Sequence, residues 1–90
     1  MVVWGAGPVG KAFARELQAQ GGHLAAFVDL DPRKIGQDIH GAPVIPPGEA
    51  NAYRDAFSVA AVGKGRAREE IRSALTELGR EEMEDFVAVA

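Results

Sequence analysis

The feature that most constrains this chain is a glycine-rich segment, Gly5-Ala6-Gly7-Pro8-Val9-Gly10, placed between a short apolar run and a helical pattern. The apolar run, residues 1–4, is typical of a buried parallel strand when a turn and a helix follow it. Residues 9–20 repeat apolar side chains at intervals of three and four, which predicts an amphipathic helix. Pro8 suits the first turn of such a helix, where a missing N–H costs little. The chain therefore opens with a strand, a tight turn and a helix.

The rest of the chain continues the alternation of strands and helices. Apolar runs at residues 23–29, 57–62 and 86–89 predict strands, and residues 66–78 predict a second amphipathic helix. Residues 41–47 are flanked by prolines, so we expect them to form a strand only at a sheet edge. A capped turn at residues 31–36 and a brief helix at residues 49–53 complete the pattern.

This alternation predicts an α/β fold in which a parallel sheet is covered on both faces. We expect a three-layer Rossmann-type half fold with a five-stranded, mainly parallel sheet of order 3-2-1-4-5 and residues 2–4 at its centre. Ninety residues suffice for one domain, so residues 1–90 are taken as a single unit.

Composition excludes several classes of function. The net charge of −3 argues against a nucleic-acid partner, because the excess of basic side chains that neutralises phosphates is missing. With no cysteine, disulfides, thiolate metal sites and cysteine nucleophiles are excluded. No apolar run reaches the roughly 20 residues of a membrane helix, and no signal peptide is evident. We expect no membrane partner and a cytoplasmic location.

The glycine segment has the context of a phosphate-binding loop. A Gly-x-Gly-x-x-Gly pattern alone is weak evidence in a chain with 11 glycines, but here it follows a strand, opens a helix and precedes an acidic residue, Asp29, by 19 residues. Gly5 would allow the tight turn, Gly7 would let backbone N–H groups approach a phosphate, and Gly10 would let the helix pack closely. Pro8 and Val9 belong to the same candidate nucleotide site. The alternative is a glycine turn kept for packing alone.

Asp29 stands where a carboxylate would accept hydrogen bonds from both ribose hydroxyls of a nucleotide. It would also repel a 2′-phosphate, which favours NAD over NADP. A solvated residue at a strand end is the alternative. Asp31, before Pro32, is better explained as a cap. We expect Arg33 and Lys34 to lie on a solvated face, although either could approach a phosphate.

A second glycine loop, Gly63-Lys64-Gly65-Arg66, joins the strand at residues 57–62 to the last long helix. In a doubly wound sheet it faces the first loop across the crevice where the strand order reverses. Its cations oppose the helix dipole, so an anion bound between the two loops would explain them. Solvated surface cations are the alternative.

The sequence shows no pairing of a nucleophile with a base. Three hydroxyl residues lie within predicted strands or helices, and neither histidine has a companion at metal-ligand spacing: these are Ser58, Ser73, Thr76, His23 and His40. The acidic run at residues 81–85 is typical of a solvated connector. We expect no catalysis within these residues, and any transferase or oxidoreductase activity would need further domains.

Together, Gly5 to Gly10, Asp29 and the segments Asp31-Pro32-Arg33-Lys34-Ile35-Gly36 and Gly41-Ala42-Pro43-Val44 resemble the CoA-binding-like NAD(P) Rossmann domains. That group includes the NADH-sensing domain of redox-responsive bacterial repressors. The chain is also similar to the nucleotide-sugar-binding domain of bacterial sugar O-acyltransferases, and residues 66–71 and 85–90 look most like domains appended to bacterial family 2 glycosyltransferases. The resemblance implies phosphates held by Gly5, Gly7 and Gly10 and a ribose or base held by Asp29.

The sequence departs from each family, since no winged helix, hexapeptide repeat or glycosyltransferase catalytic domain accompanies the motifs. Three hypotheses remain. The first is a nucleotide-binding accessory domain of a bacterial glycosyltransferase-like or sugar-modifying protein, with NAD or a nucleotide-sugar as ligand. The second is an NAD(H)-sensing regulatory domain. The third is a structural or dimerisation module that keeps the Rossmann fold without a ligand. The expected partners are a nucleotide ligand and either a second copy of the chain or a covalently linked catalytic domain.

Overall fold

The computed structural model describes residues 1–61, 65–77, 79 and 86–89, and the side chains of residues 65–68 and 86–89 are outside that description. Its strands form one six-stranded sheet of order β3-β4-β2-β1-β5-β6. Every neighbouring pair is parallel except β3 and β4, which are antiparallel. The strands are β1 (Val2–Trp4), β2 (Ala26–Val28), β3 (Asp38–Ile39), β4 (Ala42–Ile45), β5 (Ser58–Ala61) and β6 (Phe86–Val89).

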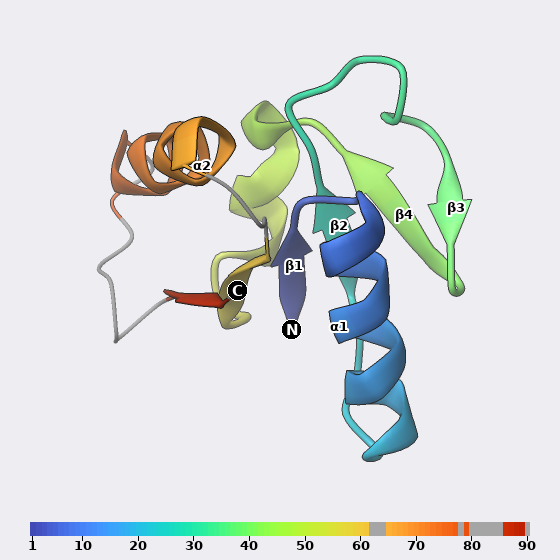
Figure 1. The fold of residues 1–90 in the computed structure, drawn as a ribbon. Coiled ribbons are helices and arrows are strands. Elements are labelled where there is room, and N and C mark those ends of the chain that lie inside the picture. The colour runs from blue at the N-terminus through green and yellow to red at the C-terminus, as the bar shows by residue number, and fades with distance from the viewer. Residues whose placement is uncertain (62–64, 78, 80–85, 90) are drawn as a thin grey trace.

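Helices cover both faces of this sheet. Helix α1 (Pro8–Ala19) lies on one side of β1, and α2 (Gly65–Glu77) lies on the other together with the 3₁₀ helix η1 (Pro47–Tyr53) (Figure 1). The core divides accordingly, because side chains alternate between the two faces of a strand. Val3 packs with the residues of the α1 layer, whereas Val2 and Trp4 pack with those of the α2 and η1 layer. The expected three-layer α/β fold is confirmed.

Trp4 is the largest fully buried side chain, and it ties two central strands together. Its indole Nε1–H donates a hydrogen bond of 3.2 Å to the hydroxyl of Ser58 at the start of β5. A buried indole N–H without a partner would be costly. Ser58, expected to lie inside a strand, therefore has a structural role in this core.

The predicted strand order is confirmed for the five parallel strands, which run β4-β2-β1-β5-β6. The prediction that residues 41–47 form the sheet edge is wrong, because the two-residue strand β3 pairs outside β4. Val44 exchanges hydrogen bonds of 2.9 Å with Gln37 and Gly36 on the β3 side. The nitrogen of Pro43 therefore faces β2, one residue before the first β2–β4 pair, Phe27 with Val44. No ladder donor is needed there, so the proline is tolerated away from the edge.

Candidate functional site

The glycine loop sits at the carboxyl end of the central strand, between Trp4 and the start of α1 at Pro8. Gly5 has a φ of 111°, a conformation that side chains rarely adopt. A Cβ on Gly10 would overlap the carbonyl oxygen of Gly5, so α1 can approach the loop only if residue 10 is glycine. The fold itself therefore explains Gly5 and Gly10. These are the roles that the sequence predicted for them: the tight turn for Gly5 and the close approach of the helix for Gly10.

Packing does not explain Gly7. Its φ is −85°, which any residue adopts, and a Cβ there would meet only the ammonium nitrogen of Lys34, at 3.5 Å. Gly7 is the N-cap of α1 and contributes no side-chain cap. In the part of the chain that the structure describes, no acceptor is found for the backbone N–H groups of Gly7, Val9 and Gly10. The helix end is therefore open to an anion, with about half a positive charge from its dipole.

Asp29 follows β2 and holds the glycine loop in place. One carboxylate oxygen accepts the backbone N–H of Ala6 at 2.8 Å, and the other accepts that of Asp31 at 2.8 Å. Its side chain is only 13% exposed. The alternative of a solvated residue is therefore wrong. This loop-fastening role was missed by the sequence reasoning, although each carboxylate oxygen keeps capacity for another donor such as a ribose hydroxyl.

Lys34 is the residue that the structure adds to the site. Its ammonium nitrogen lies 3.9 Å from the nearer carboxylate oxygen of Asp29 and beside Gly7. The sequence analysis expected Lys34 on a solvated face but allowed it to approach a phosphate; its side chain is 37% exposed, and the turn after Asp31 brings its ammonium beside Gly7. A cation, an open helix end and a carboxylate thus meet at one place. Such a set suits a phosphate joined to a ribose.

Asp31 stabilises the turn that carries Lys34, which agrees with the capping role predicted for it. Its carboxylate accepts the backbone N–H of Arg33 at 2.9 Å, and its carbonyl oxygen accepts that of Lys34 at 3.0 Å. The guanidinium of Arg33 also pairs with Asp31 at 3.0 Å while remaining 89% exposed, so Arg33 stays on the solvated face as expected. The hydrogen bonds from the guanidinium and then the backbone N–H of Arg33 lower the pKa of Asp31 from its ordinary value of 3.8, and the side-chain hydrogen bond to Asp31 raises the pKa of Arg33.

The second glycine loop is described only in part. Gly63 and Lys64 lie outside the described residues, while Gly65 and Arg66 form the first residues of α2 without a description of their side chains. Because β5 lies beside β1 and runs parallel to it, α2 begins at the same edge of the sheet as α1. An anion between the two loops remains a prediction.

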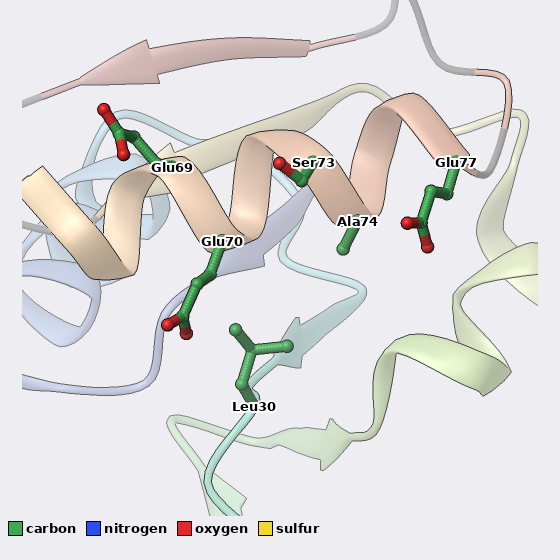
Figure 2. Close-up of a pocket in the computed structure, with 6 residues that line it drawn as sticks. All are labelled: Leu30, Glu69, Glu70, Ser73, Ala74 and Glu77. Carbon is green, nitrogen blue, oxygen red and sulfur yellow. The ribbon is translucent and has the colours of Figure 1, made fainter.

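An open cleft of about 520 Å³ lies beyond Asp29, between the chain after β2 and helix α2. Figure 2 shows Leu30 on one wall and residues of α2 on the other. The lining residues are Leu30, Glu69, Glu70, Ser73, Ala74 and Glu77. No sequence motif marks this cleft, although Glu70, Ala74 and Glu77 have the spacing of one helix face.

Two of the hydroxyl residues that the sequence analysis named have hydrogen-bond partners within the fold. Ser58 holds Trp4, and the hydroxyl of Thr76 donates to the carbonyl oxygen of Arg72. Within the described ranges, no three histidine or carboxylate side chains gather as metal ligands. No helix in the same ranges is long and apolar enough to cross a membrane.

No known family model matches the sequence, and no curated protein matches it. Solved structures share its fold. UDP-D-quinovosamine 4-dehydrogenase from Vibrio fischeri is 22% identical with a TM-score of 0.79, over 99% of this chain and 75% of that one. The Rex-family repressor RSP is 19% identical with a TM-score of 0.71, over 97% of this chain and 49% of the repressor. Its complex with β-NADH is 18% identical with a TM-score of 0.69, over 99% and 52%.

At these identities the likeness shows the fold, an α/β Rossmann-type domain. This chain spans about half the length of the repressor chains. RSP has also been solved with β-NAD⁺ and operator DNA, and that binding is a property of the longer repressor. The resemblance to acyltransferase and glycosyltransferase domains remains a prediction.

Proposed function

We propose that the chain is a nucleotide-binding accessory domain that holds the diphosphate of a dinucleotide or a nucleotide-sugar. The observation that carries the proposal is the position of the Lys34 ammonium, beside Gly7 at the open end of α1 and 3.9 Å from Asp29. The backbone N–H groups and Lys34 would bind phosphate oxygens. Asp29 would accept hydrogen bonds from the ribose hydroxyls on the same nucleotide.

The glycine pattern supports a ligand rather than a packing turn. Gly5 and Gly10 have reasons in the fold, but Gly7 has none except the space that it leaves in front of the helix end. A side chain at this position would stand where the phosphate would lie. A dimerisation module without a ligand would have no need for glycine at residue 7.

The substitution Gly7→Val tests the proposal. We expect it to weaken binding of pyrophosphate and ADP at least about tenfold, because the valine methyl groups would cover the N–H groups and displace Lys34. Isothermal titration would measure the affinities, and amide NMR spectra would show that the domain still folds. Gly48→Val is the matched control, since a Cβ at Gly48 meets nothing within 4 Å. Unchanged affinity in the Gly7 variant would remove the phosphate site.

A second candidate function is an NAD(H)-sensing regulatory domain. It is favoured by the likeness to RSP, which has been solved with β-NADH, and by the turn from Asp31 that places Lys34 at the loop. The first candidate, within a glycosyltransferase-like or sugar-modifying protein, has support from the fold of a UDP-sugar dehydrogenase. Titrations with NADH and with a UDP-sugar, followed by amide shifts of Gly5, Gly7 and Gly10, would choose between them.

A further inference from the structure

Lys34 and Asp29 form an ion pair that a nucleotide would have to separate. The Lys34 ammonium nitrogen lies 3.9 Å from one carboxylate oxygen of Asp29, the same oxygen that accepts the backbone N–H of Ala6. The other oxygen accepts the N–H of Asp31. In the described part of the chain, no second carboxylate pairs with this ammonium. Without a ligand, the cation of the site is therefore held by the carboxylate that would bind the ribose.

The two oxygens of Asp29 are not equally open to a ribose. A carboxylate oxygen has about two lone-pair sites, and each oxygen of Asp29 already uses one for a backbone N–H. A hydroxyl that donates to the oxygen near Ala6 brings its hydrogen toward the Lys34 ammonium, and the two positive ends repel each other. A ribose that donates one hydroxyl to each oxygen therefore binds well only after the ammonium has moved away.

A phosphate at the glycine loop would give Lys34 another anion to approach. The ammonium lies 3.5 Å from the position of a Cβ on Gly7, in front of the open end of α1. The Lys34 side chain is 37% exposed and flexible, whereas the Asp29 side chain is 13% exposed and fixed by two N–H donors. A phosphate group offers three strong acceptor oxygens and at least the charge of a carboxylate. It would therefore draw the ammonium away from Asp29.

We propose that Lys34 determines the specificity of this site, an inference that rests on the proposed function: Lys34 shields Asp29 until a phosphate is bound, so the site takes nucleotides and rejects nucleosides. The phosphate and the ribose are coupled through one side chain, since each favours the position of Lys34 that the other needs. A free nucleoside carries no group that draws the ammonium away. A cation that only attracted phosphates would leave the affinity for a nucleoside unchanged.

Titrations with adenosine in the presence and absence of inorganic phosphate test this inference. Amide shifts of Ala6 and Asp31, whose N–H groups donate to Asp29, would report binding at the carboxylate. We expect saturating phosphate to raise the affinity for adenosine about threefold or more, in buffers brought to equal ionic strength with potassium chloride. In Lys34→Met, adenosine should bind without phosphate about as tightly as it binds the phosphate-loaded unmodified chain, and phosphate should add nothing.

Arg15→Met is the matched control, because it removes one exposed cation from α1 and should leave the coupling intact. 2′,3′-Dideoxyadenosine lacks both ribose hydroxyls, so phosphate should not raise its affinity. An adenosine affinity that phosphate leaves unchanged, with phosphate still bound at the glycine loop, would overturn the shielding by Lys34 and leave the proposed phosphate site standing. Coupling that persists in Lys34→Met would overturn the shielding too. Phosphate that shifts none of the amides of Gly5, Gly7 and Gly10 would overturn the proposed function together with this inference.

Discussion

Asp29 connects the glycine loop to the turn after β2 before any ligand is present. Its two carboxylate oxygens accept the N–H groups of Ala6 and Asp31, and Lys34 approaches the same oxygen as Ala6. A ribose that binds here must therefore share a carboxylate already used by the fold. For this reason the recognition of ribose and the shape of the phosphate loop depend on the same side chain.

We expect Asp29→Ala to weaken binding of pyrophosphate as well as of ribonucleotides, because the loop loses its fastening at Ala6. The free energy of unfolding should fall by about 2 kcal/mol, since two backbone N–H groups lose their acceptor. Urea unfolding and isothermal titration would measure the two effects. Loss of ribonucleotide binding with full pyrophosphate affinity would show instead that Asp29 acts on the ribose alone.

Lys34→Met should lower the affinity for pyrophosphate about tenfold and reduce its dependence on salt, because the site loses its described cation. The methionine keeps most of the aliphatic length of the side chain, so the turn should be retained. Arg15→Met is the control: it removes one charge from an exposed position of α1. Equal effects of the two substitutions on binding would mean that Lys34 acts only through net charge.

The residues of the site could be predicted from the sequence to different degrees. The roles of Gly5 and Gly10 follow from the motif, since backbone conformation and close approach are local properties. Lys34 could not be placed, because the direction of its long side chain depends on a turn closed by Asp31 and on the position of Gly7. A sequence motif does not contain the distance between the Lys34 ammonium and Gly7, which depends on how the chain folds.

At the scale of elements, the approach of α1 to the glycine loop depends on Gly10. Gly10→Ala should destabilise the domain by about 3 kcal/mol or more, because the added Cβ overlaps the backbone oxygen of Gly5, which has little freedom to move. Gly48→Ala, where a Cβ meets nothing, is the comparison and should change stability by less than about 1 kcal/mol. Denaturant unfolding gives both values. Similar stabilities for the two variants would contradict this packing.

The turn that carries Lys34 should loosen in acid. The hydrogen bonds from Arg33 hold the pKa of Asp31 below 3.8, so the folded turn favours the ionised carboxylate. This stabilisation is present in full above pH of about 4. It is lost as the pH falls from 3.8 through the lower pKa of the folded state.

Amide shifts of Arg33 and Lys34 between pH 7 and pH 2 would show the loss as one titration with a midpoint below 3.8. Asp31→Asn keeps an oxygen acceptor without the charge, so the titration should disappear. A midpoint above 3.8 would contradict the hydrogen bonds to Arg33.

Most elements could be predicted because their patterns are periodic or apolar. Helices α1 and α2 and the five parallel strands follow from such patterns. Strand β3 could not be predicted, because two residues, Asp38 and Ile39, contain no period and are exposed or half-buried. Its pairing depends on Gly41, whose φ of 81° reverses the chain toward β4. For the same reason, the prediction that the proline-flanked strand β4 lies at the sheet edge was wrong.

At the scale of the whole molecule, the proposed nucleotide would contact three elements that the sheet brings to one edge. The N-terminus of α1 follows β1, Asp29 and Lys34 follow β2, and the start of α2 follows β5. These strands are neighbours in the order β2-β1-β5, and all three run parallel. A ligand across this edge would therefore contact both the α1 layer and the α2 layer, which lie on opposite faces of the sheet (Figure 1).

We therefore expect ADP to raise the melting temperature of the chain, and to raise it more than pyrophosphate does when both are present at the same concentration. A ligand at a hundred times its dissociation constant stabilises the folded state by about 2.7 kcal/mol. For a domain of this size that corresponds to a shift of roughly 10 to 20 °C. Calorimetry or fluorescence of Trp4, which is buried at the centre of the sheet, would follow the transition. Gly7→Val should show no shift with either ligand. A shift of equal size in that variant would place the binding elsewhere on the molecule, away from the end of α1.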